Sequence, residues 1–349
     1  MSNFNDFSVD FYSEVIPMPN VSNDNVDFQN LPMPIPANLH IYTELDEPMF
    51  LELVDWVDRY GIDRCILDDF AIETLELRGK FESLPEAIIT LSRLLDLKVI
   101  SDNLEKLPEK FGELVQMSHL ELLTFELSEL PASFVNIAGL EFLKVYSKKL
   151  QQLPDRFYRL FNLTNLTLWC PNLAELPEDF GRLYSLKQLD IASKKLTRLP
   201  DSMADFRSLK QFSMAVVRLE NIAQLLSDLS KVNDFELSVN EMTAIPDNID
   251  DLVNVEKLSL GSDVLTHIPD SIGSLAKLKD LSISSNMAYN FPETLSNLKN
   301  LEKLTIYSPI AKADLPNYLY ELPNLKSLKF NDNFIIGSEQ NHFNPINQH

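Results

Sequence analysis

The chain has 349 residues, with 52 acids against 30 lysines and arginines, a formal net charge of −22 and two cysteines. Such a surface repels phosphate backbones and anionic lipid headgroups, so we expect neither nucleic acid nor a membrane as a partner. No apolar run approaches membrane-spanning length, and the first residues lack the basic start and apolar segment of a secretory signal peptide. The wide separation of Cys65 and Cys170 favours a reducing, cytoplasmic compartment.

Residues 1–40 are rich in asparagine and proline, which predicts an extended or disordered acidic arm. Residues 1–58 hold eleven acids, and Arg59 is the first basic residue. Aromatic and aliphatic residues within this arm leave two interpretations open. It is either a loose tail, as chain termini often are, or a docking peptide or type III-like export leader of a bacterium.

Residues 41–71 predict an N-terminal helical cap. Pro48 suits the first helical position, apolar residues recur at helical spacing from Phe50 to Val57, and Gly61 ends the pattern. We expect Trp56 to pack against the body of the protein rather than to bind a ligand. The end of a repeat array exposes its apolar core, and a helix of this kind covers it.

From residue 72 to residue 336 a leucine-proline pair, or a close relative of it, recurs every 23 residues, with one final interval of 24. The prolines of these pairs are Pro85, Pro108, Pro131, Pro154, Pro177, Pro200, Pro246, Pro269, Pro292 and Pro316. The interval from Pro200 to Pro246 is twice the period, and Ile222 with Ala223 occupies the missing position in register. A fixed period of this size indicates a solenoid in which each repeat packs on its neighbours.

Each period predicts a short strand, a proline that ends strand pairing, and a short helical or 3-10 segment. Leu143 and Val145 alternate as inward residues of one strand, and Leu189 occupies the same inward column as Leu143, two repeats later. Phe157 and Leu160 recur at a spacing of three and are expected to close the back of the repeat. Residues 337–349 read as a polar C-terminal tail.

The pattern L-x-x-L-x-L-x-x-N-x-L-x-x-L-P resembles the leucine-rich repeat family, most closely its 23-residue, intracellular Ras-suppressor and scribble-type class with bacterial relatives. The resemblance implies an α/β solenoid, a horseshoe with a curved parallel sheet of about 12 short strands. The interior asparagine column is broken, for example at Phe125 and Pro171, whereas the preceding column is mostly serine or threonine. Either these hydroxyls satisfy the backbone of the turn, or the chain bends differently after each strand.

The outward positions of the strands carry the candidate binding site. One outward column places Ile100, Leu123, Tyr146 and Trp169 on consecutive repeats, with Phe142 just before one of these strands. None of them is assigned to the core, and a contiguous exposed apolar surface often marks an interface. The alternative is that the N-terminal arm or the cap covers this surface within the same chain.

A second candidate surface is basic, and it comes from a Ser-Lys-Lys-Leu sequence that occurs twice. Its members are Lys144, Lys148, Lys149, Lys194, Lys195 and Arg198. In an acidic chain such a cluster either steers an acidic partner or only relieves repulsion among the surrounding acids.

Chemistry-bearing constellations are missing from the sequence. Its histidines lie in unrelated contexts, no cysteine or histidine pair has metal-ligand spacing, and there is no phosphate-binding glycine loop. We therefore expect no enzyme and no cofactor. We expect a monomeric scaffold that binds a protein or peptide on its concave face, and the family resemblance suggests a role in the regulation of signalling. The alternative is an exported bacterial effector or recognition protein that acts on a host factor.

Overall fold

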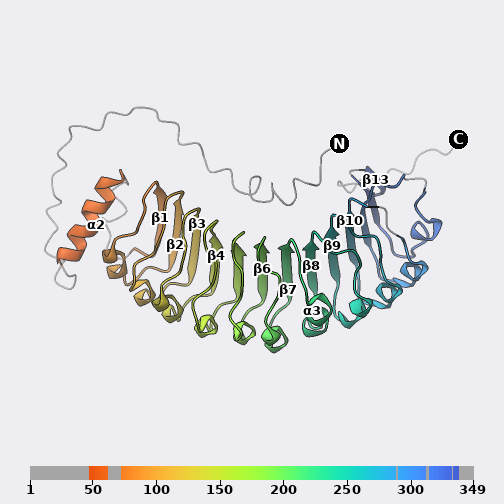
Figure 1. Cartoon of the computed structure of the whole chain (residues 1–349), viewed down its shortest axis with the longest axis horizontal. Coiled ribbons are helices and arrows are strands. Elements are labelled where there is room, and N and C mark those ends of the chain that lie inside the picture. The colour runs from red at the N-terminus through yellow and green to blue at the C-terminus, as the bar shows by residue number, and fades with distance from the viewer. Residues whose placement is uncertain (1–46, 62–71, 288–289, 312–313, 332, 338–349) are drawn as a thin grey trace, which may run out of the picture.

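The computed structural model describes residues 47–61, 72–287, 290–311, 314–331 and 333–337. Within these ranges, 13 strands form one sheet in which every strand lies beside its sequence neighbours. Figure 1 shows the result, an open arc with the strands on the concave side and the helical turns on the convex side. The expected horseshoe is confirmed.

Twelve strands are parallel, one per repeat coil, and the inward residues of neighbouring strands stay in register. The parallel strands are β1 (Thr74–Gly79), β2 (Asp96–Ser101), β3 (His119–Thr124), β4 (Phe142–Tyr146), β5 (Asn165–Trp169), β6 (Gln188–Ser193), β7 (Gln211–Val216), β8 (Asp234–Val239), β9 (Lys257–Ser262), β10 (Asp280–Ser285), β11 (Lys303–Tyr307) and β12 (Ser327–Phe330). A thirteenth strand, β13 (Asn333–Ile336), pairs antiparallel with β12 and closes the last coil.

Short helical segments return the chain along the convex side. The 3-10 segments are η4 (Glu86–Thr90), η5 (Phe111–Glu113), η6 (Ala132–Asn136), η7 (Phe157–Arg159), η8 (Phe180–Arg182), η9 (Asp201–Asp205), η10 (Asp247–Asp251), η11 (Asp270–Ser274), η12 (Glu293–Asn297) and η14 (Asn317–Leu319). Several begin directly after the proline of the repeat, where its missing N–H costs no helical bond. The coil without that proline forms a true helix instead, α3 (Ile222–Asp228).

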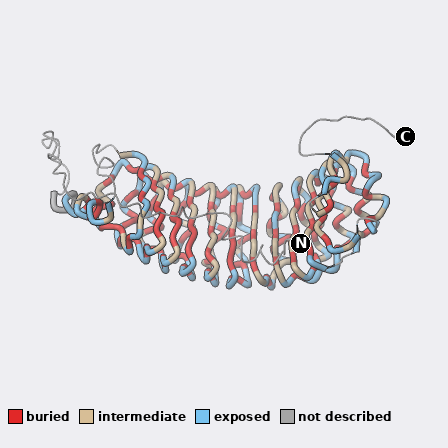
Figure 2. The backbone as a smooth tube through the Cα atoms, turned by 90° about the horizontal axis from the view of Figure 1, so that it is seen from above, coloured by how far each residue is buried: buried red, intermediate tan, exposed pale blue. Residues whose placement is uncertain are grey.

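The core runs without interruption along the array. Leu189 is fully buried, as its inward column predicts, and Figure 2 shows buried positions in every coil. Behind the strands, the buried rings of Phe111 and Phe134 stack with centroids 6.2 Å apart, and those of Phe157 and Phe180 repeat the same spacing. Adjacent strands lie about 4.8 Å apart, so these rings lengthen the convex side relative to the sheet and bend the array.

A serine ladder replaces the broken asparagine ladder, as one of the two sequence interpretations proposes. In five coils a buried serine at the end of the strand donates to a carbonyl of the preceding coil at 2.5–2.8 Å. The same hydroxyl accepts the backbone N–H two residues later. These residues are Ser101, Ser147, Ser193, Ser262 and Ser285. Each hydroxyl therefore joins two coils while satisfying backbone groups of the turn.

The expected cap helix is α2 (Glu47–Arg59), and Gly61 follows it with φ +63°. Trp56 packs as predicted, since its ring lies 5.0 Å from that of Phe81 and its Nε1 donates to the carbonyl oxygen of Ser83 at 3.0 Å. The acidic arm, most of the remaining cap and the polar tail lie outside the described residues. No helix among the described residues is long and apolar enough to cross a membrane.

Candidate functional site

The sheet register brings the predicted apolar column together. Ile100 pairs with Leu123, Leu123 with Tyr146, and Tyr146 with Trp169 on the four neighbouring strands β2 to β5. Ile100, Leu123 and Tyr146 form a hydrophobic cluster separate from the main core, with Phe125 and Trp169 partly buried against it. We call these five residues the concave apolar cluster.

The predicted exposure of this column is wrong for three of its residues. Ile100, Leu123 and Tyr146 are 7%, 5% and 4% exposed. Strands about 4.8 Å apart hold neighbouring outward side chains in contact, and large apolar groups in such a column cover one another. Trp169 remains half-buried. Phe142 lies in a different outward column, where its ring stacks on His119 with centroids 5.8 Å apart.

Two lysines lie over the rim of the cluster. The Nζ atom of Lys148 is 3.8 Å from the ring centroid of Phe125, and that of Lys144 is 5.1 Å from the ring of Trp169. Both distances are within the range of cation–π attraction. The rim therefore combines aromatic faces with positive charge.

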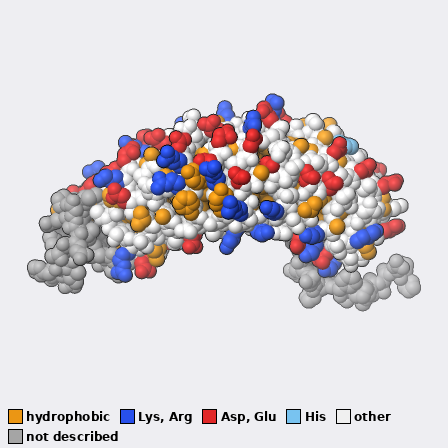
Figure 3. All heavy atoms as spheres, turned by 90° about the horizontal axis from the view of Figure 1, so that it is seen from below, with side chains coloured by type: hydrophobic (Ala, Val, Ile, Leu, Met, Phe, Trp, Pro, Cys, Tyr) orange, Lys and Arg blue, Asp and Glu red, His pale blue; other side chains and the backbone are white. Residues whose placement is uncertain are grey.

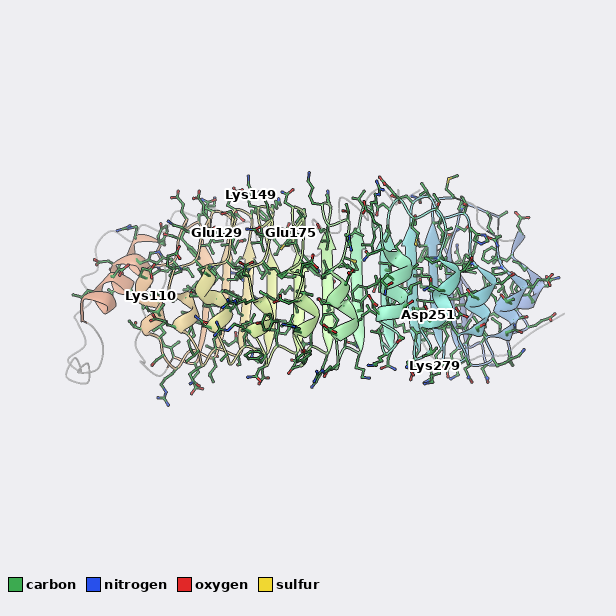
Figure 4. The ribbon with its side chains drawn as sticks, turned by 60° about the horizontal axis from the view of Figure 1, so that its bottom comes forward. Lys110, Glu129, Lys149, Glu175, Asp251 and Lys279 are labelled. Carbon is green, nitrogen blue, oxygen red and sulfur yellow. The ribbon has the colours of Figure 1, made fainter. Side chains whose placement is uncertain are left out.

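The expected basic surface does not act as one unit. Lys144 and Lys148 join the apolar cluster, whereas Lys149 lies 3.7 Å from Glu126 and Arg198 lies 3.3 Å from Asp201. Lys194 and Lys195 are exposed. Figure 4 shows Lys149 at one edge of the array between Glu129 and Glu175, which agrees with relief of acid repulsion at that edge.

Asp190 on β6 adjoins the cluster, and the sequence analysis does not single it out. The Nε1 atom of Trp169 donates to its Oδ2 at 3.1 Å. Burial raises the pKa of the Asp190 carboxyl to about 6, and the hydrogen bond from Trp169 offsets only part of that shift. The column of Asp190, Ser213 and Glu236 on β6 to β8 can be read from the sequence, but only the fold shows that Asp190 is half-buried against Trp169.

Beside Asp190 the concave face is hollowed over a volume of about 240 Å³. The polar residues that line this hollow are Gln188, Asp190, Gln211, Ser213, Asp234, Glu236 and Lys257. Three of them are acids, and one of these is paired, since Lys257 lies 3.3 Å from Asp234. The acidic hollow is thus suited to a cationic group from a partner.

Cys170 lies just behind the cluster and is fully buried. Burial raises the pKa of its thiol to about 12, so it is not a thiolate at neutral pH. Burial also raises the pKa of Tyr146. Within the described ranges, no group of three or more histidine, cysteine and acidic side chains is placed to hold a metal ion.

No protein-family model and no curated protein sequence matches the chain. Solved structures do match. The TLR13–ssRNA13 complex aligns with a TM-score of 0.58 and 20% identity over 75% of this chain and 40% of that one. The Toll–Spatzle complex of Drosophila aligns with a TM-score of 0.57 and 19% identity over 77% of this chain and 42% of that one.

A third match is a Leptospira interrogans LRR protein, with a TM-score of 0.49 and 22% identity over 73% of this chain and 76% of that one. The fold is the leucine-rich repeat solenoid. This chain spans less than half the length of the TLR13 and Toll chains, and the similarity at these identities extends to the fold alone.

Proposed function

We propose that this protein is a non-enzymatic scaffold that binds a protein or peptide partner on its concave face, across the apolar cluster and the acidic hollow. The observation that carries the proposal is Asp190, a half-buried carboxyl that accepts a hydrogen bond from Trp169, with a pKa raised to about 6, at the border between an aromatic rim and an acidic hollow. A charge in such a place weakens the fold, and perturbed carboxyls of this kind cluster at functional sites.

The chemistry of the surface defines the partner. An apolar side chain is expected to contact Trp169 and Phe125 at the rim, with Lys144 and Lys148 moving aside or contacting acids that flank it. A lysine or arginine of the partner then reaches Asp190 and Glu236 in the hollow. The Toll–Spatzle complex among the matching folds supports a protein partner, and the sequence resemblance supports a cytoplasmic signalling protein.

Peptides selected from a displayed random library on the immobilised protein test this proposal. We expect the selected sequences to place a basic residue near an apolar one. Trp169→Ala should weaken their binding about thirtyfold, as loss of an aromatic anchor typically does. The matched control is Tyr307→Ala, because Tyr307 occupies the same outward column on β11 and also has a lysine, Lys329, over its ring at 5.7 Å.

Protonation gives a second readout in the same assay. A cationic partner prefers ionised Asp190, whose pKa is about 6, so affinity should rise between pH 5 and pH 7. Asp190→Asn should remove most of that pH dependence. Equal loss of affinity in Trp169→Ala and Tyr307→Ala would contradict the proposed site.

A further inference from the structure

The convex face carries a second unusual surface, far around the coil from the apolar cluster. Phe161, Tyr184 and Arg207 occupy the same position in three consecutive coils, in the turns that follow η7, η8 and η9. Phe161 is 56% exposed and Tyr184 is 39% exposed, and both rank among the large apolar side chains that the described coils expose most. Two residues before them along the chain, Arg159 and Arg182 form a neighbouring column and are also exposed.

Aromatic contacts hold Arg182 and Arg207 in place. The Cζ atom of Arg207 lies 4.0 Å from the ring centroid of Tyr184, and that of Arg182 lies 5.7 Å from the ring of Tyr158. The Tyr158 ring in turn meets Phe161 edge-on at 6.5 Å. A guanidinium stacked on a ring keeps its N–H groups directed sideways, where they remain able to bind a carboxylate.

The charge of these arginines is not neutralised within the part of the chain that the structure describes. No carboxylate of a described residue forms an ion pair with Arg159, Arg182 or Arg207, whereas Arg198 and Arg218 pair with Asp201 and Glu220. In a chain with 52 acids, such arginines mark a local positive surface. Figure 3, which looks onto the convex face, shows basic and hydrophobic side chains gathered together over the middle coils.

We propose that this convex arginine surface, formed by Tyr158, Arg159, Phe161, Arg182, Tyr184 and Arg207, binds an acidic linear segment of a partner protein. Carboxylates of the segment pair with the guanidiniums, for which bidentate geometry is favourable. An apolar side chain of the segment lies against Phe161 and Tyr184, which supply exposed ring area.

The spacing of the coils specifies the segment further. Buried rings in the same two coils, Phe157 and Phe180, lie 6.2 Å apart, and the coil step is at least as large farther out on the convex side, where Arg159 and Arg182 are exposed. Two residues of extended peptide cover about 6.6–6.8 Å. A segment that runs across the coils therefore presents acids at alternate positions to Arg159 and Arg182, with the residue between them directed away.

A long nucleic acid is a poorer occupant than a short acidic peptide. The arginine column is bounded by Asp205, which occupies the position of Arg159 and Arg182 in the next coil. Exposed Asp155 and Glu178 flank it along the chain. A continuous phosphate backbone would meet these acids on leaving the surface, whereas a short segment ends before them.

The test uses the full chain and a fluorescein-labelled synthetic peptide with glutamates at alternate positions and one phenylalanine, against a peptide of the same composition with its glutamates adjacent. We expect tighter binding of the alternating peptide, weakened by salt. Arg159→Gln combined with Arg182→Gln should lower its affinity about tenfold. The matched control, Arg198→Gln with Arg218→Gln, makes the same charge change at paired arginines and should have no effect.

The apolar half of the surface has its own matched pair. Phe161→Ser should weaken the alternating peptide, whereas Val253→Ser should not, because Val253 occupies the same convex position and is equally exposed, at 59% against 56%. The assignment is wrong if Arg198→Gln with Arg218→Gln weakens binding as much as Arg159→Gln with Arg182→Gln does. It is also wrong if Val253→Ser weakens binding as much as Phe161→Ser does. Tighter binding of single-stranded DNA, of anionic vesicles, or of a peptide of residues 1–16 would also overturn it, since the occupant would then be of another kind. All substitutions lie away from the concave face, so failure here leaves the proposed function untouched.

Discussion

The first six coils and the last five share one backbone and one core register, yet their outward surfaces differ. On β2 to β5 the outward column is apolar and aromatic. On β8 to β10 the same column holds Ser238, Gly261 and Ser284. The repeat specifies inward residues in every coil, whereas outward columns are free to specialise. Both proposed binding surfaces therefore lie in the N-terminal coils or at their border.

Electrostatics separates the two regions in the same way. A ladder of cross-coil ion pairs runs through the C-terminal coils, with lysine to carboxylate distances of 2.7–3.9 Å. The pairs are Lys257–Asp234, Lys279–Glu256, Lys303–Asp280 and Lys326–Glu302. In the N-terminal coils the cross-coil pairs Lys98–Glu121 and Lys149–Glu126 lie in other columns, at 3.8 and 3.7 Å, and Lys144 lies over the ring of Trp169. Cross-coil ion pairs are therefore more regular in the C-terminal coils, whereas in the N-terminal coils Lys144 and Lys148 lie over the aromatic rings of the concave apolar cluster.

The largest effect should not distinguish the two regions. Leu189 on β6 and Leu281 on β10 are fully buried in the same inward column. Leu189→Ala and Leu281→Ala each leave a cavity there, so each should lower the free energy of unfolding by about 2–5 kcal/mol. Urea unfolding followed by circular dichroism measures both. A cost below about 1 kcal/mol at either site would show that the core is not equivalent along the array.

The hydrogen-bonded serines of the ladder, which occur in both regions, should differ in unfolding free energy from Ser308. Ser193→Ala removes a hydroxyl bonded to the Leu173 carbonyl and to two backbone N–H groups, and should cost about 1–3 kcal/mol. The hydroxyl of Ser308, in the same column, is buried with no hydrogen-bond partner among the described residues. Ser308→Ala is therefore expected to be neutral or stabilising in the same unfolding assay. Equal costs would mean that the hydroxyl bonds contribute little.

A smaller effect on the free energy of unfolding is expected from Asp190, which lies at the border of the two regions. Because the folded-state pKa of Asp190 is raised to about 6, the native protein binds this proton more tightly than the unfolded chain. Its contribution to stability is therefore present at low pH and is lost as pH rises from about 4 to 6.

Asp190→Asn should remove that loss, keep an oxygen acceptor for Trp169, and stabilise the protein at pH 7 by on the order of 1 kcal/mol. Unfolding free energies of both proteins between pH 4 and pH 7 give the comparison. The contrasting substitution is Glu256→Gln, just before β9, where the Nζ atom of Lys279 lies 2.7 Å from the carboxylate and its hydrogen bond lowers the pKa of Glu256. It removes an ion pair and should not stabilise the protein.

The smallest expected effect concerns one turn. Arg156 has φ +60°, whereas Asp179, its equivalent in the next coil, has φ −100°. Glycine relieves a left-handed conformation but costs chain entropy, so Arg156→Gly should change stability by less than about 1 kcal/mol, in the stabilising direction. Asp179→Gly should destabilise by about 0.5–1 kcal/mol. Thermal melts of the two variants provide the test.

The inward half of the structure was predictable from the sequence because each coil repeats the same constraint. The strand positions, the buried column of Leu189 and the cap contact of Trp56 are as expected. The serine hydroxyls stood as one of two explanations, and only the hydrogen-bond partners selected it.

The outward half was less predictable because exposure depends on neighbours that lie 23 residues away. Tyr146 reads as an exposed residue within its own strand, but the residues beside it in register bury it. The raised pKa of Asp190 arises from the same local crowding. The convex arginine surface was visible as two columns of the repeat, but the sequence interpretation did not consider the turns that follow the short helical segments.

The stacked phenylalanines also determine how large a partner the arc accommodates. Neighbouring coils are 6.2 Å apart at the rings and about 4.8 Å apart at the sheet, and the two layers are separated by about 10 Å. This difference rotates each coil by about 8° relative to the one before it, which corresponds to an inner radius of curvature of about 35 Å. A folded domain of roughly 100 residues, with a radius of gyration of about 13 Å, fits within such a curve and meets several coils at once. A single helix, about 10–12 Å wide, would touch only a few coils if it lay along the strands.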